Sequence, residues 1–179
     1  LIDRSKHFDT ELTNSIFNEL SANHSGQYRR FDLVFKLIKT TKHYDMATKN
    51  GDTALLYSVI YNRIDLVKYL VGSKCDMNAT NKYGRSALYI AVSNNYIEIT
   101  KYLIAMRMDA DAIDLDGNNA LMIAACNNNI ELAKYLVESK CDINIASQNG
   151  NTALMIAVDN NRVEMAKYLI ESKCDVNIA

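Results

Sequence analysis

Cysteine and histidine are the residues of this chain whose side chains could support the most specific chemistry, as nucleophiles, bases or metal ligands. Cys75, Cys141 and Cys174 recur at one position of a repeated pattern, and Met108 fills the remaining slot. A slot that accepts either Cys or Met indicates a small apolar packing site rather than a nucleophile or a metal ligand. No CxxC or CxxH pair occurs in the sequence, so nothing predicts a zinc site. We expect all the cysteines to stay reduced, with Cys126 the only one partly exposed.

The histidines do not form a catalytic pattern either. His7, His24 and His43 all precede residue 48, and none shares a catalytic or metal-binding spacing with a cysteine or an acidic residue. The sequence also has no glycine-rich phosphate loop. We therefore predict that the chain is not an enzyme and that it carries no cofactor or metal.

A tyrosine ladder is the remaining candidate for chemistry. Four "KYL" triplets place Tyr69, Tyr102, Tyr135 and Tyr168 at one repeated position. Aromatic ladders can stack bases, so RNA or small-ligand binding remains a distant alternative, which a steep salt dependence would favour. We favour rings packed between repeats with their hydroxyls at the surface. Each lysine follows an acidic residue by three positions, which predicts exposed ion pairs Asp65–Lys68, Glu98–Lys101, Glu131–Lys134 and Glu164–Lys167.

The composition limits the classes of partner. Twenty Lys and Arg against 21 Asp and Glu give a formal net charge of −1. Proteins that bind nucleic acid by neutralising phosphates usually have a basic excess, so nucleic acid is disfavoured as a partner. No apolar run approaches the roughly 18 residues that a membrane span requires. Apolar residues make up 49% of the chain, enough for a substantial core.

The elements that position these residues repeat with a fixed period. Glycines recur every 33 residues, at Gly51, Gly84, Gly117 and Gly150. Such a period indicates a solenoid in which each unit packs only against its neighbours. Within one unit the apolar spacing predicts helices over 53–61 and 64–72. The predicted N-caps are Thr53, Ser86, Asn119 and Thr152, and the predicted left-handed helix stops are Asn62, Asn95, Asn128 and Asn161.

This unit resembles the ankyrin repeat, whose pattern is roughly D-x-x-G-x-T-P-L-H-x-A-A-x-x-G-H, then a helix, then G-A-D-V-N-A. The resemblance implies an all-α, ankyrin-type helix-turn-helix solenoid with short β-turn tips. Three departures recur: Ala for Pro, Leu, Tyr or Met for His, and Lys or Arg for one Gly. They fall at Ala54, Ala87, Ala120 and Ala153; at Leu56, Tyr89, Met122 and Met155; and at Lys74, Arg107, Lys140 and Lys173. We expect these departures to reduce local rigidity and to leave the fold intact.

The repeats divide the chain at residue 48. Residues 48–179 hold four repeats, the last one truncated, and residues 1–47 are expected to form a degenerate, capping N-terminal repeat. The overlay of "YRRFDLVFKLIK" on "YNRIDLVKYLVG" aligns Asp32 with Asp65 and Leu33 with Leu66, and it predicts helices over 12–22 and 31–39.

The last repeat indicates a fragment of a longer protein, so we expect the natural chain to continue after Ala179. Its apolar C-terminal face predicts weak end-to-end self-association.

Function is expected where the repeats differ from one another. In ankyrin repeats these positions are the turn tips and the concave helix face, which commonly contact partner proteins. In repeats one and two they are Lys49, Asn50, Asp52, Ile60 and Tyr61, then Lys82, Tyr83, Arg85, Ser93 and Asn94. In repeats three and four they are Leu115, Asp116, Asn118, Cys126 and Asn127, then Gln148, Asn149, Asn151, Asp159 and Asn160.

The predicted function is non-catalytic binding of another protein. Tyr and Arg are over-represented among interface hot spots, and we expect Tyr61, Tyr83 and Arg85 to converge on one groove. Lys49 and Lys82 would steer an acidic segment toward repeats one and two. The alternative is a targeting arm of a larger enzyme or effector whose catalytic domain lies outside these residues. Reduced cysteines predict a reducing compartment: the cytoplasm, the nucleus or a host cytosol.

Overall fold

The computed structural model describes residues 15, 17 and 27–177, and the side chains of 27–32 are not described. This part of the chain is helical, and its β-pairing is a single isolated bridge between Ala47 and Thr53. The helices are α2 (Gln27–Thr41), α3 (Ala54–Ile60), α4 (Ile64–Gly72), α5 (Ala87–Ser93), α6 (Ile97–Ala105), α7 (Ala120–Cys126), α8 (Ile130–Glu138), α9 (Ala153–Asp159) and α10 (Val163–Glu171). The predicted all-α fold class is confirmed. The predicted helix 12–22 lies outside the described residues except for positions 15 and 17, which are helical.

The first helix of each pair starts at the predicted cap. The side-chain oxygens of Thr53 and Ser86 accept hydrogen bonds from the backbone N–H groups three residues later, at 3.3 and 3.2 Å. Asn119 and Thr152 do the same at 3.0 and 3.3 Å. Each cap satisfies an N–H group that the helix itself leaves unpaired. The local sequence therefore determines where these helices begin.

The helices of a pair are separated by a left-handed residue. Asn62, Asn95, Asn128 and Asn161 have φ between 55° and 59°, as predicted. The amide of Asn62 donates to the carbonyl of Val59, and that of Arg63 donates to Ser58. This pair of hydrogen bonds is the Schellman arrangement, which closes a helix C-terminus around one left-handed residue.

The same arrangement ends each second helix and explains the cysteine slot. Lys74, Arg107, Lys140 and Lys173 occupy the left-handed position, with φ between 59° and 67°. The residue after Lys74 is Cys75, whose amide donates to the carbonyl of Leu70 at 3.3 Å. A Schellman motif often buries an apolar side chain at this position. Cys75, Met108 and Cys141 are buried there, which confirms the interpretation of this slot as a packing site.

The described residues divide into two compact units, a first unit within residues 1–82 and a second unit within residues 83–179. In the first unit, Phe17 meets Tyr57 edge to face with ring centroids 5.3 Å apart, and both rings are buried. Val34 and Ile38 of α2 are buried, whereas Leu33 is 53% exposed. The predicted overlay of Leu33 on Leu66 is therefore wrong by one residue.

A shorter connection explains this shift. Lys42, with φ 55°, is the counterpart of Lys74, which lies 32 residues later. The turn that begins at Thr48 keeps the spacing of 33 to Asn81, so the link between α2 and that turn lacks one residue. The helix boundary prediction fares better, because 31–39 falls inside α2.

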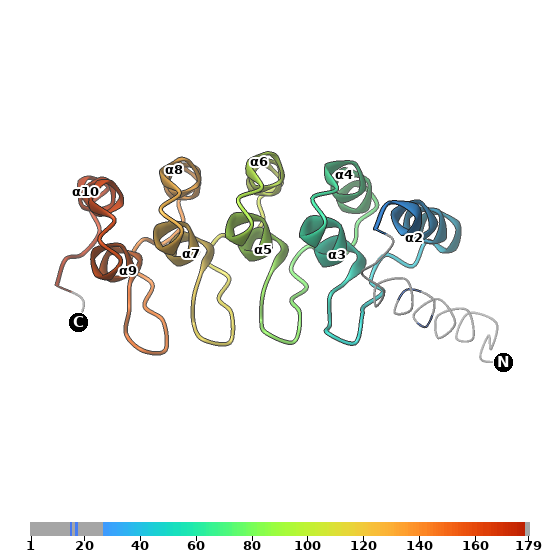
Figure 1. Cartoon of the computed structure of the whole chain (residues 1–179), viewed down its shortest axis with the longest axis horizontal. Coiled ribbons are helices and arrows are strands. Elements are labelled where there is room, and N and C mark those ends of the chain that lie inside the picture. Colours follow the sequence, from blue (N-terminus) through green and yellow to red (C-terminus); the bar gives the residue numbers. More distant parts are fainter. Residues whose placement is uncertain (1–14, 16, 18–26, 178–179) are drawn as a thin grey trace. The chain divides into compact units, whose positions relative to one another are not determined.

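The second unit has two layers of helices. Figure 1 shows α5, α7 and α9 in one row and α6, α8 and α10 in the other, with long loops leaving the first row on the side away from the second. The first helices bury small residues at one repeated position, where Ala91, Ala124 and Ala157 are all fully buried. Small side chains allow the first helices to lie close together. The loops are thereby held side by side on one face of this unit.

Candidate partner-binding surface

The loops before the first helices end in tight turns, which we call fingers. Finger 1 has its turn at 48–51, finger 2 at 81–84, finger 3 at 114–117 and finger 4 at 147–150. The amide of Gly51 donates to the carbonyl of Thr48 at 2.8 Å, and Gly117 and Gly150 make the equivalent bonds to Asp114 and Ser147 at 3.0 and 2.9 Å. These bonds close fingers 1, 3 and 4 as β-turns.

Backbone hydrogen bonds join adjacent finger tips. In the first unit the amide of Lys82 donates to the carbonyl of Asn50, and in the second unit Leu115 donates to Tyr83, both at 3.0 Å. A Cβ atom on Gly117 would lie 2.7 Å from the amide nitrogen of Gln148, and the φ of Gly117 is +80°. Only glycine suits that backbone conformation and that close approach. At Gly51, Gly84 and Gly117 the 33-residue glycine period therefore reflects contact between fingers, and at Gly150 it reflects the left-handed backbone alone.

In fingers 1 and 3, a polar side chain at the base of the turn accepts hydrogen bonds from the backbone of that turn. The carboxylate of Asp114 is buried and accepts hydrogen bonds from the amides of Asp116 and Asn118, at 3.0 and 2.8 Å. Thr48 supports finger 1 in the same way through its hydroxyl. Sequence reasoning missed these residues, although Thr, Asn, Asp and Ser at 48, 81, 114 and 147 are typical of side chains that stabilise turns.

Finger 2 carries an aromatic and a cation in contact. The Arg85 guanidinium lies 5.3 Å from the ring centroid of Tyr83 and 5.5 Å from that of Tyr89. Tyr83 is 47% exposed, whereas Tyr89 is buried. Burial and the hydrogen bond that Tyr89 donates to Asp114 raise the pKa of Tyr89 to about 12. Arg85 is thus held between an exposed ring and a ring anchored on finger 3.

Finger 3 adds exposed apolar side chains beside Tyr83. Leu115 is 63% exposed and Ile113 is 52% exposed, while Asp114 between them is buried. This alternation is expected of extended backbone, in which successive side chains point to opposite sides. Because the amide of Leu115 is bonded to the carbonyl of Tyr83, the two exposed side chains belong to adjacent tips. We refer to Tyr83, Arg85 and Leu115 together as the tip cluster.

The predicted residues of the first unit include two lysines on finger turns. Lys49 and Lys82 are exposed, and the Lys82 ammonium donates to the side-chain oxygen of Asn50 at 2.6 Å. The Asp52 carboxylate accepts from the Asn81 amide at 2.9 Å, so it supports the fingers. Ile60 and Tyr61 are half-buried, and the Tyr61 ring lies 4.6 Å from that of Tyr57. Since Tyr61 belongs to the first unit and Tyr83 and Arg85 to the second, their convergence stays a prediction.

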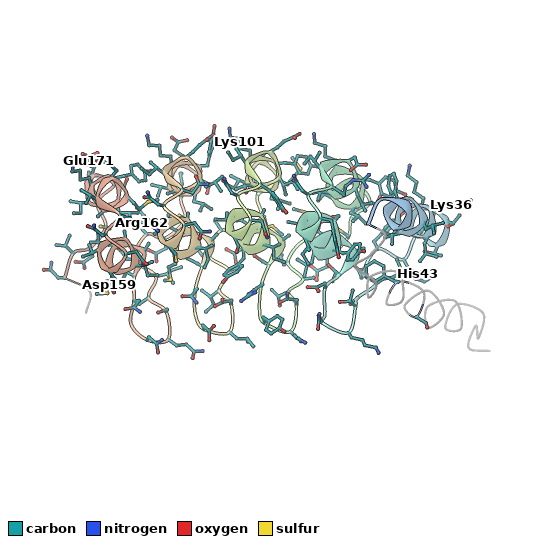
Figure 2. The ribbon with its side chains drawn as sticks, viewed as in Figure 1. Lys36, His43, Lys101, Asp159, Arg162 and Glu171 are labelled. Atoms are coloured by element: carbon teal, nitrogen blue, oxygen red, sulfur yellow. The ribbon has the colours of Figure 1, made fainter. Side chains whose placement is uncertain are left out.

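The remaining predicted residues lie on the second unit. Ser93, Asn94, Asp116, Asn127 and Asp159 are exposed, and Asn118 and Asn151 are half-buried. The side-chain amide of Asn127 donates to the carbonyl of Ser93 at 3.2 Å, and that of Asn94 donates to Ile90 at 2.9 Å. Each of these two side-chain amides therefore uses an N–H donor to bond a backbone carbonyl of the scaffold. Figure 2 shows Asp159 on the α9 side of this unit and Lys101 on the opposite, α6 side.

The charges on the second helices pair both within a repeat and between repeats. The pair Lys167–Glu164, at 3.0 Å, has the predicted spacing. Lys101 bonds Glu131 of the next repeat at 3.1 Å and lies 4.3 Å from the ring centroid of Tyr135, and Asp65 bonds Arg63. A lysine can reach across the gap between stacked helices, where a ring and a carboxylate both attract it. The tyrosines of the ladder are half-buried, in line with packing between repeats.

The cysteines carry no reactive arrangement in the described residues. All four are free, and burial raises the pKa of Cys75 to about 11 and that of Cys141 to about 12. Cys126 is exposed, as expected, but Cys174 is half-buried, so Cys126 is not the only accessible thiol. Over the described residues we find no cluster of His, Cys, Asp or Glu that could hold a metal ion. None of the described helices is long and apolar enough to cross a membrane.

A protein-family model matches the repeated part of this chain. The model of ankyrin repeats in three copies covers residues 21–114 and 107–179. The chain belongs to the ankyrin repeat family. Ankyrin repeats are generally protein–protein interaction modules and are typically non-catalytic. No curated protein matches this ankyrin repeat chain significantly.

Proposed function

We propose that this ankyrin repeat protein binds another protein, without catalysis, through its finger tips and the exposed ends of its first helices. The observation that carries the proposal is the tip cluster, in which Tyr83 and Leu115 are exposed on adjacent hydrogen-bonded tips and Arg85 lies against Tyr83. Large side chains held at the surface of a rigid scaffold are suited to act as interface anchors.

The tip cluster is organised before any partner arrives. A backbone hydrogen bond fixes Tyr83 to the tip that carries Leu115, and the buried carboxylate of Asp114 accepts hydrogen bonds from the backbone of that tip. Little further ordering is needed on binding, so more of the contact energy appears as affinity. Tyr83 and Leu115 offer apolar area, and the Arg85 guanidinium offers a fork for a carboxylate.

The charges of the fingers suggest the character of the bound segment. Lys49 and Lys82 in the first unit favour acidic residues, with a larger effect on the association rate than on the lifetime of the complex. Asp116 and Asp159 in the second unit favour neutral or basic residues. The partner segment is therefore acidic where it meets the first unit and neutral or basic where it meets these two carboxylates.

Alanine scanning against a partner isolated by affinity capture and mass spectrometry tests the proposal. Tyr83→Ala and Arg85→Ala should each weaken binding by about 1–3 kcal/mol in calorimetry, with the fold intact by circular dichroism. Lys134→Ala on the second helices is the matched control and should leave affinity nearly unchanged. Equal, negligible losses for all three variants would remove the tip cluster from consideration.

A further inference from the structure

Aromatic rings of the first unit form a corner that plays no part in the finger tips. Phe35 of α2 meets Tyr69 of α4 with ring centroids 5.5 Å apart and an interplanar angle of 86°. Tyr44 packs on the same Tyr69, at 6.4 Å and 68°. Phe35, Tyr44 and Tyr69 are all half-buried, so the rings remain accessible. We call the pair Phe35 and Tyr69, supported by Tyr44, the aromatic corner.

A cation already lies inside this corner. The ammonium nitrogen of Lys39 is 4.1 Å from the ring centroid of Phe35 and 5.3 Å from that of Tyr69. It lies over both ring faces, and the rings are nearly perpendicular, so it occupies the space between two walls. Ring faces carry the negative part of the aromatic quadrupole and attract cations. In the second unit, Lys101 and Lys134 lie over the single rings of Tyr135 and Tyr168, at 4.3 and 5.8 Å.

The resident lysine is displaceable. Lys39 is exposed and its ammonium sits on a flexible four-carbon stem, and a primary ammonium is strongly hydrated. It therefore gives up much hydration when it lies against rings. A quaternary ammonium has no N–H groups to hydrate, so it loses less hydration free energy than a primary ammonium on entering the same corner. Burial and the hydrogen bond with Tyr44 raise the pKa of Tyr69, which keeps that ring a neutral phenol.

We propose that the aromatic corner of Phe35 and Tyr69 is a binding site for quaternary ammonium groups, with the Lys39 ammonium as its built-in competitor. The recognised chemistry is a permethylated ammonium, whether on a small molecule or on a methylated lysine side chain of another protein. This site is independent of the tip cluster, because the two share no residue.

Titration by NMR of the whole chain tests the site. The probes are tetramethylammonium, choline, and a peptide with one trimethyllysine beside its unmethylated twin. Binding should move the probe's methyl resonance upfield, as a ring face does. Lys39→Met should bind tetramethylammonium about fivefold more tightly than the wild type, because it removes a competitor held by about 1 kcal/mol. Phe35→Leu should abolish the shift by removing one wall.

The controls distinguish binding at this site from non-specific binding of the probes. Lys134→Met leaves only the single ring of Tyr168 and should give no gain in binding. The neutral carbon isostere of choline should bind neither variant, because it lacks the charge that the ring faces attract. If only the peptide binds, the ligand is a methylated protein; if only choline and tetramethylammonium bind, it is a small molecule. Equal affinity of Lys39→Met and Lys134→Met, or equal binding of the isostere, would overturn the proposal even if Phe35→Leu fails to fold.

Discussion

Tyr89 and Asp114 join the start of one first helix to the base of the next finger. The Tyr89 hydroxyl donates a hydrogen bond to the Asp114 carboxylate, and both residues are buried. Tyr89 occupies the position where the ankyrin pattern has His. A hydrogen bond from this position to the finger of the following repeat ties these two elements together.

Removing this hydroxyl should cost stability. Tyr89→Phe keeps the ring and leaves the buried Asp114 carboxylate with one donor fewer, so the free energy of unfolding should fall by about 1–3 kcal/mol. Urea unfolding followed by circular dichroism measures the change. Tyr168→Phe, at a half-buried ring on α10, is the control and should shift the midpoint little. An unchanged midpoint for Tyr89→Phe would mean that the bond has no net value.

Alkaline pH should destabilise the fold through buried groups. The pKa of Cys141 rises from 9.0 to about 12 and that of Tyr89 from 10.0 to about 12 in the folded chain. A raised folded pKa gives stability that is complete below the unfolded value and is lost as pH rises toward the folded value. Unfolding free energy should therefore decline from about pH 9 to pH 12, and the decline should be shallower in Cys141→Ala. An identical slope in that variant would exclude the thiol as a contributor.

The left-handed lysines predict a stabilising substitution. Lys140 is exposed and has φ 67°, a conformation that costs a residue with a Cβ about 1–2 kcal/mol. Lys140→Gly removes this strain and adds some unfolded-state entropy, so a net gain of about 0.5–1 kcal/mol is expected in thermal or urea unfolding. Lys134→Gly, inside α8, should instead lose about 1 kcal/mol. If both variants lose stability equally, the left-handed position carries no strain.

A buried hydroxyl predicts a second stabilising change. Thr100 on α6 is fully buried, and its hydroxyl oxygen has no hydrogen-bond partner. Thr100→Val keeps the shape and removes the unpaired polar atom, so the free energy of unfolding should rise by about 1 kcal/mol. Ser58→Ala is the matched control, because the Ser58 hydroxyl donates to the carbonyl of Leu55 at 2.7 Å and its loss should not stabilise. A loss of stability in Thr100→Val would show that the hydroxyl is satisfied.

The sequence by itself determined the features that depend on local backbone chemistry. Thr53 and Asn119 cap helices because their side-chain oxygens reach amides three residues away. Asn62 ends a helix because Asn tolerates the left-handed conformation better than most residues. These interactions span a few residues, so they can be inferred from neighbouring letters, and the period of 33 then repeats them. The positions of the candidate partner-binding residues on finger tips and helix ends followed from the same period.

Only the tertiary structure decided which side chains meet across repeats. Lys101 bonds Glu131, 30 residues away, because stacking brings the next helix within reach of a long side chain. Leu33 is exposed because a connection one residue shorter rotates α2 relative to the overlay. The tip cluster depends on the backbone bond between Leu115 and Tyr83, and that bond exists only once the fingers stack. Such contacts depend on distances between elements, which a single sequence does not encode at any one position.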